Sequence, residues 1–242
     1  MEFLFKIYIA YILDLILGDP YRIPHPVQII GKLISFLEKK LINFPNKRFY
    51  GGVLNILVLS ITFIVCYFLQ KIIFIEIYLM YTIFSTRCLA NEGNKVYKIL
   101  KEDNIVKARK ELSYLVSRDT ENLQKEDIIR STMETISENT VDGVIAPMLF
   151  MFIGGLPLAM VYKAINTMDS MLGYKNEKYK DFGYFSAKID DWANFIPARV
   201  TRGLLITIAC FFLKYDFRNS FMIFIRDRLN HSSPNSAHSE AA

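Results

Sequence analysis

Cysteine and histidine are scarce in this 242-residue sequence, with three of each. The cysteines (Cys66, Cys88 and Cys210) lie in apolar stretches and form no C-x-x-C pair, which excludes a disulfide framework and a cysteine zinc site. No H-x-x-x-H pair is present, which argues against a histidine zinc hydrolase. The phosphate loop G-x-x-x-x-G-K-S/T and the turn G-x-G-x-x-G are also absent. Because the basic residues form no stripe, we expect no nucleic-acid partner.

Charged residues are also few, at 22%, against 52% apolar residues and a mean hydropathy of +0.23. This composition excludes a disordered or low-complexity chain. From Gly51 to Gln70 the sequence contains no charged residue. A helix of that length extends about 30 Å, the hydrocarbon thickness of a bilayer. We therefore predict that residues 51–70 span a membrane.

Four further apolar segments extend this prediction to a bundle; they cover about residues 3–17, 72–90, 144–165 and 203–217. Gly154, Gly155 and Pro157 interrupt the fourth segment and would leave backbone groups unpaired in a continuous helix. We expect a broken helix or a re-entrant hairpin there. The predicted fold class is all-α: a polytopic membrane helical bundle with cytoplasmic helical segments, forming one integral membrane domain over residues 1–242.

Lysine and arginine set the expected orientation of the chain, because basic loops favour the cytoplasmic side. Lys39, Lys40, Lys47 and Arg48 follow the first anchor, so that connection is expected in the cytoplasm. Two crossings then return the chain, which places residues 91–143 on the same side. A re-entrant hairpin would keep the basic stretch 166–202 there as well, and a full crossing is the alternative. We expect a multi-pass protein of the cell membrane whose site faces the cytoplasm.

Carboxylates repeat every four residues in KEDIIRSTMETISENTVDG, where Arg130, Glu134, Glu138 and Asp142 share one helix face. An exposed acidic stripe is usually solvated surface. This stripe, however, leads into a broken membrane segment, where carboxylates are costly without a partner. Like charges at this spacing repel unless a cation lies between them. The two interpretations are therefore a solvated surface and a site for Mg²⁺ or a cationic substrate, with Glu138 and Asp142 as the metal ligands.

Amides and carboxylates recur together in KAINTMDSMLGYKNEKYKDFG and in IDDWANFIPAR. Oxygen ligands of this kind suit Mg²⁺ bound with a phosphate, and nearby cations can bind the phosphate. The alternative is hydrogen bonding between the helices of a membrane bundle. The candidate catalytic residues are Glu134, Glu138, Asp142, Asp169 and Lys175. The candidate substrate- or phosphate-binding residues are Arg118, Asp119, Asn139, Asn166, Asn176, Asp190, Asp191, Asn194 and Arg199. His25, between two prolines, is interpreted as structural.

Four motifs in order resemble the CobD/CbiB family, the adenosylcobinamide-phosphate synthases of cobalamin biosynthesis. They are LDLILGDPYRIPHPVQIIGKLI, LVSRDTENLQKEDIIRSTMETISENTVDGVIAPMLF, YKAINTMDSMLGYKNEKYKDFGYFSAKIDDWANFIPAR and SSPNSAHSEAA. The resemblance runs from about Leu13 to Ala242, with a variable apolar part at 41–85. It implies an acid–amine ligase that joins adenosylcobyric acid to (R)-1-aminopropan-2-ol or its O-phosphate. It also implies ATP as co-substrate, Mg²⁺, corrinoid and amino-alcohol substrates, and a lipid bilayer around the protein.

The resemblance leaves several alternatives open. Members of the family usually continue beyond PNS-x-x-x-EAA, whereas this sequence ends there, so we expect the C-terminal part of the family pattern to be missing. Protein partners consistent with the resemblance are a second copy of the chain or other membrane proteins of the corrinoid pathway. A membrane transporter, which commonly has broken helices, or a non-catalytic membrane subunit is the alternative function. Asp142-Gly143-x-x-Ala146 also resembles the start of a CDP-alcohol phosphotransferase motif, but Pro147 stands where that motif has arginine.

Overall fold

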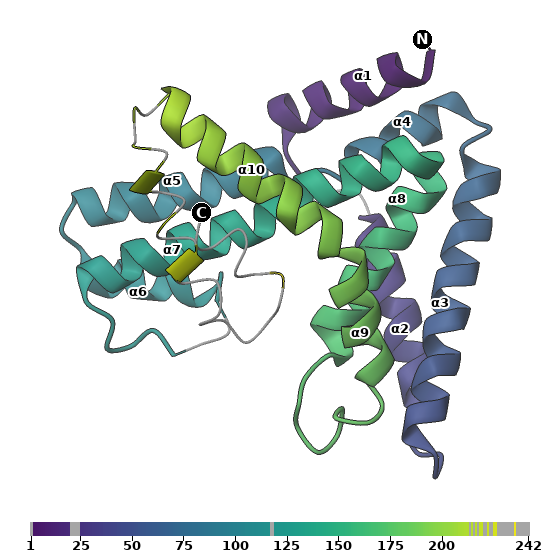
Figure 1. The fold of residues 1–242 in the computed structure, drawn as a ribbon. Helices are drawn as coiled ribbons and strands as arrows, with labels where there is room; N and C mark the ends of the chain where they lie inside the picture. The colour runs from purple at the N-terminus through teal and green to yellow at the C-terminus, as the bar shows by residue number, and fades with distance from the viewer. Residues whose placement is uncertain are drawn as a thin grey trace. The chain divides into compact units, whose positions relative to one another are not determined.

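The computed structural model describes residues 2–19, 25–116 and 119–212, together with 214, 216, 218–219, 222, 225–226 and 235. Over these residues the chain is helical and contains no strand, which confirms the all-α prediction (Figure 1). The elements are α1 (Glu2–Leu17), α2 (Pro26–Leu41), α3 (Lys47–Leu69), α4 (Ile73–Tyr81), α5 (Thr86–Lys101), α6 (Ile105–Ser113), α7 (Lys125–Thr140), the π-helix η1 (Val141–Ile145), α8 (Ala146–Leu172), α9 (Tyr184–Ala193) and α10 (Phe195–Phe212).

The chain forms two compact units by its internal contacts. Unit 1 comprises Met1–Ser85 and Asp142–Pro197, and unit 2 comprises Thr86–Val141 and Ala198–Ala242. In unit 1, α3 packs against α2, α8 and α9, and α1 packs against α4. In unit 2, α5, α6 and α7 pack on one another around a small apolar core: Val96, Ile99, Leu100, Ala108, Leu112 and Ile128. That both units belong to one integral membrane domain stays a prediction.

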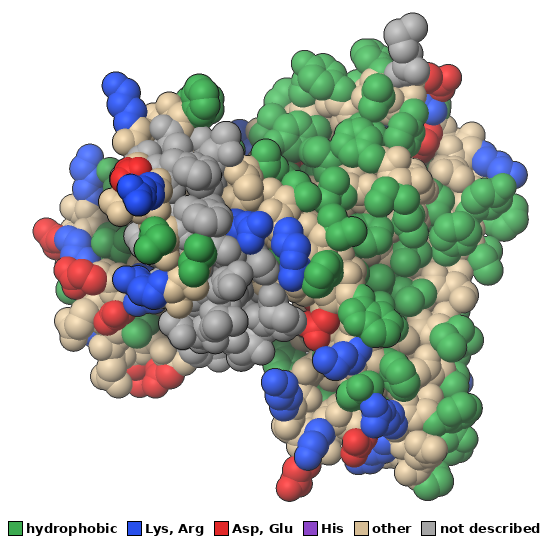
Figure 2. Space-filling view, in the orientation of Figure 1, with side chains coloured by type: hydrophobic (Ala, Val, Ile, Leu, Met, Phe, Trp, Pro, Cys, Tyr) green, Lys and Arg blue, Asp and Glu red, His purple; other side chains and the backbone are tan. Residues whose placement is uncertain are grey.

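Helix α3 contains the uncharged run that the sequence analysis assigned to the membrane. Asn46 begins it, because its side-chain oxygen accepts a hydrogen bond from Phe49 N at 3.1 Å. One face packs inside unit 1, and the other exposes long apolar side chains: Ile56, Leu57, Ile61, Phe63, Ile64, Val65, Tyr67 and Phe68. Figure 2 shows hydrophobic side chains gathered over α1, α3 and α4. Such a surface suits lipid, because exposed apolar side chains cost nothing in hydrocarbon.

Three helical stretches among the described residues are long and apolar enough to cross a membrane. They are Lys47–Leu69, Ile73–Lys101 and Lys125–Leu172. They contain all of the predicted segment 144–165 and all but one end residue of the predicted segments 51–70 and 72–90. The protein therefore has the character of a membrane protein. The outer segments 3–17 and 203–217 correspond to α1 and to part of α10, and their membrane crossing stays a prediction.

The predicted segment 72–90 is divided in the structure. Helix α4 ends at Tyr81, and α5 begins only at Thr86. The Thr82 hydroxyl donates to the Leu79 carbonyl at 2.9 Å, and Ser85 N donates to the Gly143 carbonyl at 3.0 Å. These bonds satisfy backbone groups at the helix end, as burial requires. The chain thus leaves unit 1 between α4 and α5.

Helix α8 is broken at Gly154 and Gly155, as the sequence predicts. Gly155 has φ 65° and ψ −162°, a conformation that is open essentially to glycine alone. Figure 1 shows the two parts of α8 running in different directions. The broken helix is confirmed, and its re-entrant path through a membrane stays a prediction.

Close backbone contacts hold α9 against α3 and α8. A Cβ at Gly51 would lie 1.9 Å from the Phe182 carbonyl oxygen, and one at Gly183 would lie 1.7 Å from the Leu172 carbonyl oxygen. Asn55, buried in α3, donates from Nδ2 to the Ser186 hydroxyl of α9 at 3.0 Å. Because these contacts permit no larger side chain, α9 is held in a fixed position along α8.

Candidate functional site

The π-helix η1 carries Asp142 at the start of α8. Pro147, near the start of α8, has no N–H to donate to the Gly143 carbonyl, which accepts a hydrogen bond from Ser85 N. A π turn spaces hydrogen bonds five residues apart and shifts the faces of the helix. The four-residue repeat of the acidic stripe therefore ends at η1. Turns of this kind occur frequently at functional sites.

Two side chains of α8 bind the Asp142 carboxylate. The hydroxyl of the fully buried Tyr162 lies 2.9 Å from Asp142 Oδ1. The Asn166 amide donates from Nδ2 to Asp142 Oδ2 at 3.0 Å. Both oxygens of the carboxylate thus have partners one turn apart on a single helix. This pairing lets a carboxylate remain beside an apolar core.

Helix α9 brings a second carboxylate to the same cluster. Asn194, which follows α9 and is buried, has its Oδ1 2.8 Å from the Tyr162 hydroxyl. Its Nδ2 donates to Asp190 Oδ2 at 3.0 Å. Burial, together with the negative charges of Asp142, Asp169 and Asp191, raises the pKa of Asp190 to about 8. We call Asp142, Tyr162, Asn166, Asp190 and Asn194 the central cluster.

Lys163 supplies a positive charge next to the central cluster. Its Nζ lies 3.4 Å from the Asp142 backbone carbonyl, and the carboxylates of Asp142 and Asp19 are the opposite charges that act on it. A lysine in such surroundings is costly unless anions compensate it. Asp142 and Asp19 provide that compensation.

His25 is the N-cap of α2, and the charge of Lys163 acts on it. Its Nδ1 accepts a hydrogen bond from Val27 N at 3.3 Å, which caps the helix together with Pro26. Burial lowers the pKa of His25; Asp19 opposes this shift, and Lys163 adds to it. The neutral ring, which alone can accept the capping bond, is thus favoured at neutral pH. This supports the structural interpretation of His25.

The structure brings some of the predicted site residues together in unit 1, and several others belong to unit 2. Asp142, Asn166, Asp190 and Asn194 belong to the central cluster, and Asp169 and Asp191 add their charges to it. Lys175 and Asn176 are exposed in the loop before α9, where Asn176 Oδ1 accepts from Tyr179 N at 3.0 Å. Unit 2 contains Asp119, Glu134, Glu138, Asn139 and Arg199. Arg118 lies outside the described residues, as does the motif SSPNSAHSEAA apart from Asn235.

The acidic stripe is partly engaged within its own helix, since Arg130 Nε donates to Glu134 Oε1 at 2.9 Å. Glu138 is exposed. Among the described residues no group of three or more His, Cys, Asp or Glu side chains is arranged to hold a metal ion. Mg²⁺ commonly binds one or two carboxylates together with substrate phosphate, a coordination that needs no such group. Glu138 and Asp142 as Mg²⁺ ligands stay a prediction.

Tyr162 and Lys163 were not among the candidate site residues predicted from the sequence, although Lys163 shares a predicted helix face with Asn166. Tyr162 lies in an apolar run, where a tyrosine is expected to pack, and its hydroxyl partners come from segments distant in the chain. Tyr162 could have been identified from the sequence, because the hydroxyl of a tyrosine buried in an apolar segment needs a polar partner. For Lys163 the signal was a lone cation at the end of an apolar segment, since such residues commonly mark a functional site.

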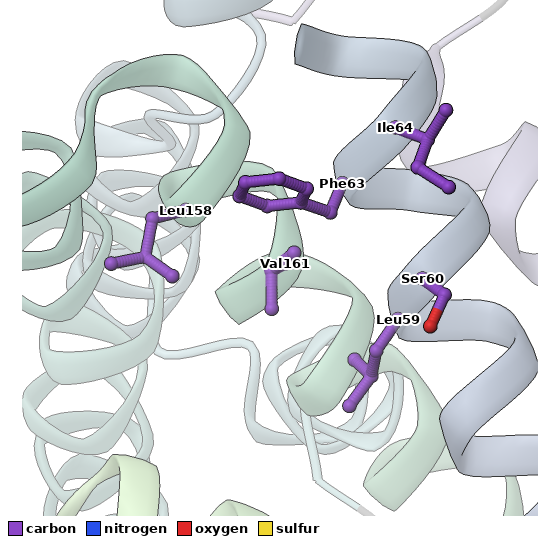
Figure 3. A pocket seen from close by; sticks show the side chains of 6 residues that line it. All are labelled: Leu59, Ser60, Phe63, Ile64, Leu158 and Val161. Atoms are coloured by element: carbon purple, nitrogen blue, oxygen red, sulfur yellow. The ribbon is translucent and has the colours of Figure 1, made fainter.

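Unit 1 also has a groove of about 390 Å³ between α3 and α8 (Figure 3). Its lining residues are Leu59, Ser60, Phe63, Ile64, Leu158 and Val161. None of these side chains is ionisable, so the groove offers apolar packing and no acid–base chemistry. The central cluster is therefore the better candidate for a site.

Comparison with known proteins gives matches over nearly the whole chain. Residues 7–242 match the family model described as CobD/Cbib protein. The cobalamin biosynthesis protein CobD of Clostridium perfringens (strain 13 / Type A) is 52% identical over 98% of this chain and 78% of its own length. CobD of Listeria monocytogenes serotype 4b (strain F2365) is 46% identical over 96% of this chain and 78% of the relative. The cobalamin biosynthesis protein CbiB of Salmonella arizonae is 44% identical over 96% of this chain and 77% of the relative. No solved structure matches. The chain therefore belongs to the CobD/CbiB family.

Proposed function

We propose that this protein acts in cobalamin biosynthesis as an ATP-dependent acid–amine ligase. It would join the carboxylate of adenosylcobyric acid to (R)-1-aminopropan-2-ol or its O-phosphate, giving adenosylcobinamide or its phosphate. Family membership and the names of the relatives support the pathway. The observation that carries the chemistry is the central cluster, where two carboxylates, two amides and a tyrosine hydroxyl meet beside Lys163.

Amide formation requires an activated acid and an uncharged amine. ATP would supply the activation by transferring its terminal phosphoryl group to the substrate carboxylate. The amine nitrogen then attacks the carbonyl carbon, the new C–N bond forms, and the C–O bond to phosphate breaks. Before the attack the ammonium group must lose a proton to a base.

Asp142 is our candidate for that base. In this role one carboxylate oxygen accepts the proton of the ammonium group while Tyr162 and Asn166 hold the carboxylate in place. Lys163, close to the Asp142 carbonyl, would attract the anionic carboxylate or phosphate of the substrates. The negative Asp142 and the positive Lys163 thus lie next to each other. This arrangement suits an amine and a phosphorylated acid that bind side by side.

Asp142→Asn tests this assignment. The variant keeps the size and the hydrogen-bonding shape of the side chain but cannot accept a proton, so we expect product formation to fall on the order of a hundredfold or more. The assay uses the purified full chain in nanodiscs with adenosylcobyric acid, ATP and the amino alcohol, and mass spectrometry detects the amide. Asp103→Asn is the matched control, because Asp103 pairs with Lys125 on an exposed surface of unit 2.

Each outcome of that assay has a distinct meaning. Product from the wild type and from Asp103→Asn, but not from a folded Asp142→Asn, supports the proposal. Full activity of Asp142→Asn would remove this residue from the site. Corrinoid uptake into proteoliposomes without product would favour a transporter, which the broken helix α8 also suits. Activity that appears only when another membrane protein is added would favour a non-catalytic subunit.

A further inference from the structure

The hydroxyl of Tyr162 has one hydrogen and two neighbouring acceptors. Its oxygen lies 2.9 Å from Asp142 Oδ1 and 2.8 Å from Asn194 Oδ1. At such distances each pair of oxygens requires a hydrogen between them. The Asn194 amide hydrogens on Nδ2 are directed at Asp190. The single hydroxyl hydrogen of Tyr162 can therefore lie in only one of the two oxygen pairs, and the other pair has no hydrogen between its atoms. The central cluster therefore contains one more hydrogen than its ionised side chains supply.

Two arrangements can provide the missing hydrogen. In the first, Asp142 is protonated and donates to Tyr162, which then donates to Asn194 Oδ1. In the second, the Asn194 amide is rotated by 180°, which exchanges its oxygen and nitrogen without moving heavy-atom positions. Its Nδ2 then donates to Tyr162, whose hydrogen goes to Asp142. The rotated Oδ1 now faces Asp190 Oδ2 at 3.0 Å, so this arrangement requires a proton on Asp190.

The surroundings of the two carboxylates favour the second arrangement. Burial raises the pKa of Asp142 too, but a hydrogen-bond donor at each of its oxygens and the positive charge of Lys163 oppose that rise by stabilising its charged form. Asp190 Oδ1 is buried with no hydrogen-bond partner among the described residues.

Three negative charges act on Asp190. They come from Asp142 of η1, Asp169 of α8 and Asp191 of α9 itself. On α3, which also packs against α9, Arg48 lies over the Tyr184 ring at 3.6 Å, at the other end of α9. Burial and these carboxylates raise the pKa of Asp190 to about 8, which agrees with a neutral acid at pH 7.

We propose that Asp190 is a protonated carboxylic acid in the folded protein and that it directs, through the rotated Asn194 amide, the hydroxyl hydrogen of Tyr162 to Asp142. Asp190, in α9, and Asn194, at the end of α9, are then positioning residues for Asp142. Their part in catalysis rests on the proposed function, whereas the arrangement of hydrogens does not.

Infrared spectroscopy of the purified full chain in nanodiscs at pH 7 tests the proposal without any substrate. We expect a carboxylic-acid C=O band that is lost in Asp190→Asn and retained in the matched variant Asp142→Asn. The asparagine of Asp190→Asn can still donate to Asn194, so this variant should fold. Loss of the band in Asp142→Asn instead would establish the first arrangement and overturn the proposal. Absence of any such band in the wild type would overturn it as well, even if Asp190→Asn fails to fold.

Asn194→Leu tests the link to Asn194. Leucine has a similar size but accepts no hydrogen bond, so the Asp190 hydroxyl loses its acceptor and its C=O band should move to higher frequency. If the band does not move in a folded Asn194→Leu variant, the Asp190 hydroxyl does not donate a hydrogen bond to Asn194. If the bands behave as expected but no amide product is ever found, the hydrogen arrangement stands and the proposed function fails.

Discussion

The two carboxylates of the central cluster differ in what surrounds them, and this difference predicts how stability depends on pH. Asp190 has an ordinary pKa of 3.8, which burial and neighbouring carboxylates raise to about 8 in the folded protein. Between these values the folded state holds a proton that the unfolded state has released. Stability linked to Asp190 is therefore full below about pH 4 and is lost as the pH rises toward 8. We expect the Asp190→Asn variant to lack this decrease in stability with rising pH.

The measurement is thermal unfolding of the wild type and of Asp190→Asn in the same detergent at several pH values. The difference between the two curves isolates Asp190, because every other titratable group is common to both proteins. The wild type should lose stability relative to the variant as the pH increases from 4 to 8. Parallel curves over that range would contradict a raised pKa at Asp190.

At the scale of single elements, the break in α8 depends on Gly155. A Cβ at Gly155 would meet only ordinary contacts, the nearest being Pro157 Cδ at 3.7 Å, so space is available for alanine. The backbone at φ 65° and ψ −162°, however, is strained for any residue with a Cβ. We therefore expect Gly155→Ala to destabilise the protein by about 1–3 kcal/mol, measured by unfolding in detergent.

Gly31→Ala is the matched control for that prediction. Gly31 lies within α2, and an added Cβ would lie 3.7 Å from Met171 Sδ, an ordinary contact. Alanine is preferred to glycine inside a helix by roughly 0.5–1 kcal/mol, so this variant should be at least as stable as the wild type. Equal effects of the two substitutions would mean that the backbone of Gly155 carries no strain.

Local signals predicted the elements well where composition alone decides them. The absence of charge from Gly51 to Gln70 predicted most of α3, and the paired glycines predicted the break in α8. The division between α4 and α5 was not predicted, because Thr82–Ser85 contains the apolar Ile83 and Phe84 and its backbone partner, Gly143, lies far along the chain. The π-helix was also not predicted, because the four-residue repeat of acidic residues assumes a regular α-helix up to Asp142.

At the scale of the whole molecule, the candidate site was only partly readable from the sequence. Residue type singled out Asp142, Asn166, Asp190 and Asn194, and the structure brings them together. Their connection through Tyr162 depends on how α8 and α9 pack, which close contacts at Gly51 and Gly183 determine. Periodicity along one helix cannot report such contacts between helices. It also could not show that Glu134 and Glu138 belong to a different compact unit from Asp142.

The orientation of the chain in the membrane gives the last prediction. The bias of basic residues predicts that residues 91–143 and, with a re-entrant α8, residues 166–202 lie on the cytoplasmic side, and that the turn between α3 and α4 lies on the opposite side. In a chain whose native cysteines are replaced, we expect Lys125→Cys and Lys178→Cys to react with a membrane-impermeant thiol reagent only in inside-out vesicles. Lys71→Cys, in the turn after α3, is the matched control and should react only in right-side-out vesicles. Labelling of Lys125→Cys and Lys178→Cys from opposite sides would mean that α8 crosses the bilayer completely. The polar segment before α9 would then lie outside the cell, where cytoplasmic ATP could not reach it.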